Sequence, residues 1–151
     1  MLQSTFEIVS NKNLTGNTWE MVLRGDTSAI TAPGQFVNIR IEGMYLRRPI
    51  SVCNVENNLL TLIYKVVGKG TEAMSAMAAG TELNLLSGLG NGYDLEKCGE
   101  NPLLIGGGAG VPPMYLLARK LLAAGKKPAV ILGFNTAAEI FYEEEFKALG
   151  V

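Results

Sequence analysis

The chain contains 151 residues, with 13 Lys plus Arg against 14 Asp plus Glu and a net charge of −1. This balance argues against a nucleic-acid-binding protein, because holding a polyanion requires an excess of basic residues. The sequence has no histidine and two cysteines, Cys53 and Cys98. It therefore excludes a His-dependent nucleophilic site, a His-ligated metal and a four-thiolate cluster built from these residues alone.

The N-terminal segment, residues 1–13, lacks the apolar core of a signal peptide. No apolar run reaches the roughly 18 residues that a membrane-spanning helix needs. The two cysteines are far apart in sequence, which suits a reducing compartment better than a disulfide framework. We therefore expect a cytoplasmic protein with no membrane partner and no nucleic-acid partner.

The first two thirds of the chain have the pattern of β-strands. Apolar and polar residues nearly alternate over residues 6–9, 18–23 and 36–41, and residues 59–67 are rich in β-forming types. Several short strands at close spacing predict a small antiparallel barrel. One short helix interrupts them, with Thr71 as its expected cap.

The pattern changes near Gly99. The continuously apolar run at residues 102–105 is typical of a strand buried on both faces, and a glycine cluster follows it. Residues 112–125 then predict a helix that is opened by two prolines and closed by a glycine. A second apolar strand follows at residues 129–132. This order indicates a parallel sheet with crossover helices.

A last helix is predicted after Thr136, because Thr136 and Glu139 have the spacing of a capping box. Its apolar stripe would contain Tyr142, Phe146 and Leu149. Two strands and two helices do not cover both faces of a parallel sheet. We therefore expect residues 99–151 to be the N-terminal, incomplete part of a nucleotide-binding domain.

Two adjacent arginines, Arg47 and Arg48, lie in a strand-like context. Neighbouring strand residues point to opposite faces, so only one of the two can face a given ligand. Arg48 followed by Ser51 is suited to a ligand that carries a phosphate and a ring edge. An edge strand with solvated arginines is the alternative.

Three glycine-rich segments are further candidates for binding. Residues 68–71 precede the short helix, and residues 106–110 join a strand to a helix, where α/β sheets bind a nucleotide diphosphate. The second segment is not a dinucleotide fingerprint, because Val111 occupies the last glycine position, and it is not a Walker loop. Residues 86–93 predict a third loop. Each segment alone also fits a plain turn.

Taken together and in this order, these segments resemble the ferredoxin-reductase superfamily, and in detail the electron-transfer subunits of B-type dihydroorotate dehydrogenase. The resemblance assigns FAD binding to three strand or helix segments and NAD binding to one glycine turn. The FAD residues would be Arg48, Pro49, Ile50, Ser51, Ile63, Tyr64, Lys65, Gly70 and Thr71, and the NAD residues would be Gly106, Gly107, Gly108 and Gly110.

The resemblance also implies a fold and an activity. Residues 1–98 would form a six-stranded antiparallel Greek-key FAD-binding barrel, followed by the first half of a parallel-sheet nucleotide-binding domain in residues 99–151. Such a subunit passes electrons between a [2Fe-2S] cluster and NAD through FAD, which supports the oxidation of dihydroorotate to orotate in pyrimidine biosynthesis. Its partner is an FMN-containing catalytic subunit, and the cluster ligands lie in a C-terminal part that these residues do not include.

Two other functions stay open. One is a reductase subunit of another complex in the superfamily, of the hydrogenase or ferredoxin:NADP type, and the other is a non-catalytic nucleotide-binding barrel. No side chain is expected to act as a catalytic acid or base, since hydride transfer between cofactors requires none. Residues 133–146 contain no Lys or Arg, and Asn135 stands where phosphate-binding relatives tend to have Arg. This predicts a preference for NAD over NADP.

Overall fold

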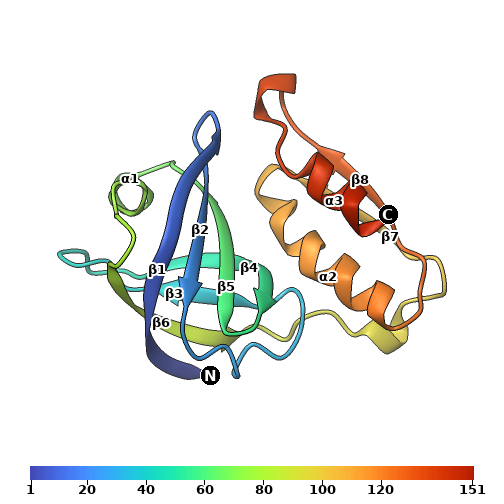
Figure 1. Ribbon diagram of the computed structural model, residues 1–151, viewed down its shortest axis with the longest axis horizontal. Coiled ribbons are helices and arrows are strands. Elements are labelled where there is room, and N and C mark those ends of the chain that lie inside the picture. The colour runs from blue at the N-terminus through green and yellow to red at the C-terminus, as the bar shows by residue number, and fades with distance from the viewer.

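The computed structural model describes residues 1–151, which form a barrel and a smaller α/β unit beside it (Figure 1). The barrel is closed, and its neighbouring strands follow the order β1-β2-β5-β4-β3-β6 with antiparallel pairing throughout. This confirms the predicted six-stranded Greek-key barrel. Its strands are β1 (Leu2–Thr15), β2 (Thr18–Arg24), β3 (Phe36–Ile39), β4 (Arg48–Glu56), β5 (Leu59–Lys65) and β6 (Glu82–Leu89).

The long strand β1 closes the barrel, because its first half pairs with β6 and its second half pairs with β2. Alternate residues of each strand point inward and form one core, which includes the fully buried Phe6, Met21, Leu60 and Leu62. Helix α1 (Lys69–Ser75) adds the buried Met74 to this core. Each such side chain contributes about 1.5–3 kcal/mol to folding relative to an exposed one.

The α/β unit contains two parallel strands, β7 (Leu103–Gly107) and β8 (Ala129–Gly133). Helix α2 (Pro112–Ala123) is the crossover between them, and α3 (Glu143–Leu149) follows β8. The predicted β-α-β-α order is therefore confirmed. Three short 3-10 turns complete the unit: η1 (Leu95–Lys97), η2 (Gly108–Gly110) and η3 (Ala137–Glu139). No helix in the structure has the length and apolar character that crossing a membrane requires.

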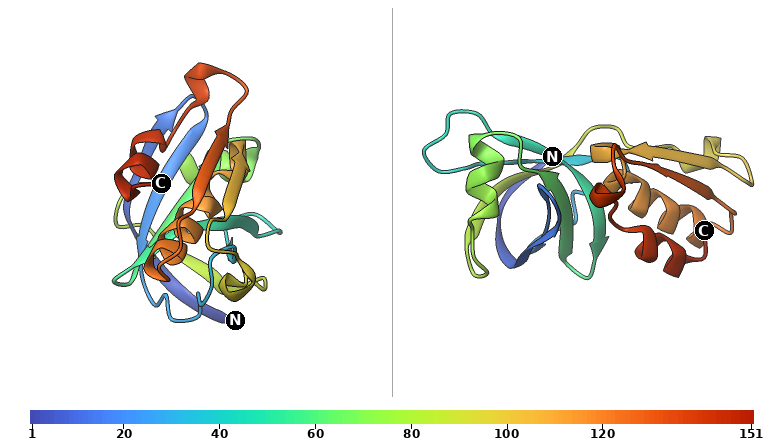
Figure 2. Two further views of the ribbon diagram at one scale, coloured as in Figure 1. Left: turned by 90° about the vertical axis from the view of Figure 1, so that its right-hand side faces the viewer. Right: turned by 90° about the horizontal axis from the view of Figure 1, so that it is seen from above.

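Helix α2 joins the unit to the barrel (Figures 1 and 2). Cys53 of β4 and Ile63 of β5 point out of the barrel and pack with Leu117 and Leu121 of α2 in a second apolar cluster. Leu104 of β7 belongs to the same cluster. One helix therefore contacts the barrel wall and the parallel sheet together, and this contact holds the two units side by side.

Both predicted helix caps differ from the structure. Helix α1 begins at Lys69 after Gly68 and ends at Ser75, so Thr71 lies in its first turn rather than at the cap. The Thr136 hydroxyl donates to the Glu139 carboxylate at 3.1 Å, but this pair closes only the turn η3. The last helix begins later because Tyr142 has a left-handed backbone with φ of 64°, which interrupts any helix that starts at Thr136.

The predicted loop at residues 86–93 is also partly wrong. Residues 86–89 are the end of β6, and the loop begins only at Gly90. A register shift between β3 and β6 falls at Ser87 and Gly88, and Gly88 has φ of 72°. A bulge with a glycine in this conformation lets the strand continue in the sheet. The glycine-rich composition had instead suggested a loop.

The apolar runs predict parallel strands that are buried on both faces, but the structure buries only one face of each strand. Leu104 and Val130 face α2 and α3, whereas Leu103, Ile105 and Ile131 point to the opposite side and are 56%, 67% and 52% exposed. Parallel sheets are normally covered on both faces. The two strands therefore present one apolar face that nothing in residues 1–151 covers.

A partly buried hydrogen bond crosses between the units near α3. The Tyr142 hydroxyl donates to the carboxylate of Glu20 on β2, which is 9% exposed and also lies 3.4 Å from the Lys12 ammonium. Burial, together with Glu20 and Cys53, raises the pKa of Tyr142, so the phenol stays protonated and donates. This bond fixes α3 against the barrel beside the buried thiol of Cys53.

We expect the uncovered sheet face to cause self-association. Exposed apolar patches on a sheet tend to pair with other molecules. Light scattering should therefore show dimers or larger species of the 151-residue protein. The double variant Ile105→Lys, Ile131→Lys should shift the population toward the monomer, whereas the control Lys120→Glu at an exposed position of α2 should not. A strictly monomeric unmodified protein would contradict this prediction.

Loss of the Tyr142 hydroxyl should loosen the contact between the units. Tyr142→Phe keeps the ring but leaves the Glu20 carboxylate with one partner fewer, at a cost of about 1–3 kcal/mol. Cys53 is fully buried at this contact, so its alkylation rate, measured in a Cys98→Ser background, should rise roughly tenfold. Tyr115→Phe is the matched control, because the Tyr115 hydroxyl makes no side-chain hydrogen bond. Equal alkylation rates in both variants would disprove the role of the hydroxyl.

Candidate functional site

β4 and β5 separate at one end of the closed barrel. The two strands pair from Val52–Leu62 to Glu56–Leu59, with a register shift at Cys53. Before Val52 β4 pairs only with β3, and beyond Leu62 β5 pairs only with β2. A bulge bends its strand and ends the local pairing. The start of β4 and the end of β5 therefore form two walls of a gap.

A cavity of about 360 Å³ lies in this gap, which we call the barrel cavity. Its walls come from the start of β4, the end of β5, the first turn of α1 and the glycine turn of the α/β unit. Every residue predicted to bind FAD lines it except Gly70. The lining residues are Arg48, Pro49, Ile50, Ser51, Ile63, Tyr64, Lys65, Val67, Thr71 and Ala109.

Gly70 contributes to the barrel cavity through Arg48. The Arg48 guanidinium lies against Gly70 so closely that a Cβ at this position would clash with it. The guanidinium also donates to the carbonyl oxygen of Leu46 and approaches the sulfur of Met44 at 3.4 Å. The missing side chain therefore lets a cation lie against the first turn of α1, whose backbone N–H groups have no acceptor within the helix.

Arg47 points the other way, as the alternation of strand side chains predicts. Its guanidinium donates to the carbonyl oxygens of Asn38 and Asn84, and to the Asn84 side chain at 2.6 Å. These bonds tie the β3–β4 connection to β6. Arg47 is therefore a structural residue of the barrel, whereas Arg48 is the arginine that lines the barrel cavity.

Tyr64 and Thr71 line the barrel cavity, but their hydroxyls are already engaged. The Tyr64 hydroxyl donates to Asn11 at 2.8 Å, and burial raises the pKa of Tyr64 to about 12. The Thr71 hydroxyl accepts from the backbone N–H of Val67 at 3.0 Å and donates to the carbonyl oxygen of Gly68. Both side chains therefore shape the cavity and its turn, and any polar contact to a ligand falls to Arg48, Ser51 and Lys65.

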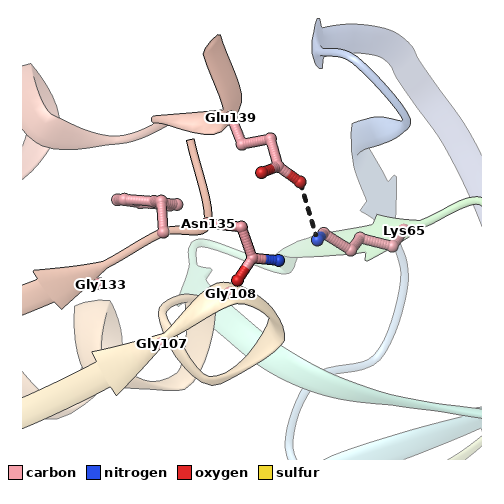
Figure 3. Close-up of a pocket in the computed structure, with 7 residues that line it drawn as sticks. Lys65, Gly107, Gly108, Gly133, Asn135 and Glu139 are labelled. Carbon is pink, nitrogen blue, oxygen red and sulfur yellow. Dashed lines mark ion pairs between the residues drawn. The ribbon is translucent and has the colours of Figure 1, made fainter. Parts of the chain in front are cut away.

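A second cavity, of about 300 Å³, lies at the carboxyl ends of β7 and β8 (Figure 3). We call it the sheet-end cavity. Gly107 and Gly133 end the two strands side by side and leave the opening free of side chains. This is the edge at which open parallel sheets bind their ligands. The other lining residues are Lys65, Gly108, Phe134, Asn135 and Glu139.

The predicted NAD glycines divide between this cavity and the packing beneath it. Gly107 and Gly108 line the sheet-end cavity, whereas Gly106 is buried, and a Cβ there would lie 2.7 Å from the Gly110 carbonyl oxygen and 3.0 Å from Met114. Gly106 therefore allows close packing of the turn on α2. Gly110 lines neither cavity.

The helix after the glycine turn has few donors for a phosphate. Pro112 and Pro113 are its first two residues and have no N–H, and the Met114 N–H donates to the Val111 carbonyl oxygen at 3.0 Å. The start of α2 therefore lacks most of the donors that make a helix N-terminus an anion site. The donors at this edge come from the glycine turn, from Asn135 and from Lys65.

Phe134 and Glu139 line the sheet-end cavity but had not been predicted as site residues. They follow the carboxyl end of β8, as Asn135 does, and this position after a parallel strand is the signal that could have identified them. A third cavity, of about 540 Å³, lies under the β3–β4 loop and is lined by residues including Arg40, Tyr45 and Asn84. It contains none of the predicted site residues.

Solved structures share this fold. No family model matches the chain. The reductase GcoB of an Amycolatopsis cytochrome P450 system superimposes with a TM-score of 0.86 at 23% identity, covering 98% of this chain and 48% of that protein. An NADH-dependent reduced ferredoxin-NADP oxidoreductase gives a TM-score of 0.84 at 29% identity, covering 95% of this chain and 53% of that one. Phthalate dioxygenase reductase superimposes with a TM-score of 0.78 at 21% identity, covering 96% of this chain and 48% of that protein.

Curated sequences are more similar still. The electron transfer subunit of dihydroorotate dehydrogenase B (NAD(+)) from Shouchella clausii is 42% identical over 156 residues, covering 98% of this chain and 60% of that protein. The corresponding subunit of Lysinibacillus sphaericus is 41% identical, with the same two coverages of 98% and 60%. The chain is thus homologous, along nearly its whole length, to the electron transfer subunits of dihydroorotate dehydrogenase B, and it spans about three fifths of their length.

Proposed function

We propose that this chain is the FAD-binding part of an electron-transfer subunit that serves a dihydroorotate dehydrogenase of the B type. The observation that carries the proposal is the barrel cavity, where eight of the nine residues expected to contact FAD meet from three separate segments, and the ninth, Gly70, makes room for Arg48. A plain surface turn or an edge strand with solvated arginines would not bring these segments together.

The residues that line the barrel cavity fit FAD in charge and in polar groups. Its pyrophosphate would be held by the Arg48 guanidinium together with the adjoining first turn of α1, where charge-assisted hydrogen bonds contribute about 1.5–3 kcal/mol each. Ser51 and the strand edges of β4 and β5 would hold the ring. Two separate anion-holding elements suit a diphosphate better than a monophosphate, which favours FAD over FMN as the bound flavin.

NAD would bind in the sheet-end cavity, with Gly107 and Gly108 allowing its close approach. Bound FAD would supply the redox chemistry, since a flavin exchanges electrons singly with an iron–sulfur cluster and in pairs, as hydride, with a nicotinamide. The chain's own residues position the two ligands: Ala109 of the glycine turn lines the barrel cavity, and Lys65 lines both cavities. No acidic or basic side chain is needed to move a proton in this step.

The complete protein would act within an assembly in the cytoplasm. A [2Fe-2S] cluster would be held by residues outside positions 1–151, and an FMN-containing catalytic subunit would oxidise dihydroorotate to orotate and pass electrons toward NAD. The domain division that this implies is a flavin barrel in residues 1–98 and part of an NAD-binding domain in residues 99–151.

A second candidate is a reductase subunit of a ferredoxin-linked complex. The likeness to a ferredoxin-NADP oxidoreductase at 29% identity favours it, although the dihydroorotate dehydrogenase subunits are more similar at 42%. Purification of the native complex with its partner separates the two. Co-purification with a dihydroorotate-oxidising subunit supports the first function, and co-purification with a ferredoxin-dependent enzyme supports the second.

The bound flavin should be FAD, and Arg48 should retain it. Arg48→Ala removes the cation beside α1 and should weaken FAD binding about tenfold to a hundredfold. Arg47→Ala should instead lower the melting temperature, because it breaks bonds between the barrel strands. Chromatography of heat-released flavin and the ratio of flavin to protein absorbance measure both effects. Recovery of FMN alone, or equal flavin loss in both variants, would refute the assignment.

Gly70→Ala should weaken FAD binding without destabilising the fold. Alanine suits the helix better than glycine by about 0.5–1 kcal/mol, but its Cβ would push the Arg48 guanidinium out of place. We expect lower flavin occupancy at an equal or higher melting temperature. Glycine-to-alanine at Gly68, where nothing lies within 4 Å of an added Cβ, is the control. If Gly70→Ala binds FAD as tightly as the unmodified protein, the close approach of Arg48 has no functional role.

The complete protein should prefer NADH to NADPH. A 2′-phosphate is usually held by Arg or Lys after the second strand of a nucleotide domain, and residues 133–146 contain neither, while Glu139 places a carboxylate there. Steady-state kcat/KM with a dye acceptor measures the preference. The variant Asn135→Arg should reduce the preference for NADH over NADPH. Higher kcat/KM with NADPH in the unmodified protein would overturn the prediction.

A further inference from the structure

One lysine belongs to both cavities. Lys65, the last residue of β5, lines the barrel cavity beside Arg48 and Ser51, and it lines the sheet-end cavity beside Gly108 and Asn135. A narrow cavity that Lys65, Gly108 and Ala109 help to line shares residues with the other two. The charge of this side chain therefore acts on a ligand in either place.

In the sheet-end cavity this charge is already neutralised. Lys65 is the only cation among the lining residues and Glu139 is the only anion. The Lys65 ammonium lies 3.5 Å from the Glu139 carboxylate, and the pair spans the space between the barrel and the α/β unit (Figure 3). The two side chains are 26% and 29% exposed. An ion pair with this much exposure contributes little to stability, so it separates readily.

We propose that Glu139 competes internally for Lys65, and that an anionic nucleotide enters the sheet-end cavity by displacing the Glu139 carboxylate from this lysine. The class of ligand, a nucleotide with a pyrophosphate, rests on the proposed function. A pyrophosphate attracts the Lys65 ammonium as the carboxylate does. It also accepts hydrogen bonds from the Asn135 amide and from the backbone of the glycine turn, which the Glu139 side chain does not use. Both partners are long side chains, so the exchange requires no backbone movement.

Glu139 therefore lowers the affinity of the sheet-end cavity for an anionic nucleotide. Removing its charge frees Lys65 before the ligand arrives, so the ligand no longer has to break the ion pair. Since the pair is partly solvated, the gain is small, about two- to fivefold in Kd. The gain should decrease as ionic strength rises, because salt weakens the Lys65–Glu139 attraction in the unmodified protein as well.

Isothermal titration with the 151-residue protein tests the proposal, with ADP-ribose and inorganic pyrophosphate as probes. Glu139→Gln should bind both probes two- to fivefold more tightly than the unmodified protein. Glu144→Gln removes the same charge from an exposed position on α3 that lines neither cavity, and it should bind as the unmodified protein does. In a Lys65→Met background, Glu139→Gln should give no gain.

Three results would overturn the proposal: equal affinity of Glu139→Gln and the unmodified protein, the same gain in Glu144→Gln, or a gain that persists without Lys65. Failure of both probes to bind to any variant would overturn it too. Tighter pyrophosphate binding by Glu139→Gln without ADP-ribose binding would support the exchange at Lys65 and count against the pyridine-nucleotide assignment, so the two claims are separated.

Discussion

The separation of β4 from β5 beyond the Val52–Leu62 pair is the constraint on which the rest of the structure depends. A continuous ladder between the two strands would close the barrel wall and leave no cavity. The pairing ends at Val52 and Leu62, next to the bulge at Cys53, so the start of β4 and the end of β5 turn their edges toward the barrel cavity instead of toward each other. Because the strands stay paired with β3 and β2, the barrel stays closed and keeps its core beside the gap.

The same two strands also hold the α/β unit. Their inward residues Val52 and Leu62 belong to the barrel core, whereas the outward residues Cys53 and Ile63 pack under α2. Because side chains alternate along a strand, the inward set packs in the barrel core and the outward set contacts the α/β unit. The next outward residue of β5 is Lys65, which places a charge where the two units meet. The barrel cavity and the sheet-end cavity are therefore neighbours that share Lys65.

The sequence predicted the barrel, the parallel β-α-β-α order and the opposite directions of Arg47 and Arg48, because these depend on periodicity and on alternation along strands. It did not predict where the last helix begins, since the left-handed backbone of Tyr142 is set by its contacts with Glu20 and Tyr115, residues distant in sequence. The site residues on β4, β5 and α1 came from a family resemblance. The ion pair between Lys65 and Glu139 and the close approach of Arg48 to Gly70 are tertiary contacts, which no local pattern encodes.

The most direct test of the central claim is an experimental structure of the protein loaded with FAD. The account predicts the flavin in the gap between β4 and β5, with its pyrophosphate within hydrogen-bonding distance of the Arg48 guanidinium and the first turn of α1. A flavin bound elsewhere, for example in the larger cavity beneath the β3–β4 loop lined by Arg40 and Asn84, would contradict it. So would a flavin in the gap whose phosphates make no contact with Arg48.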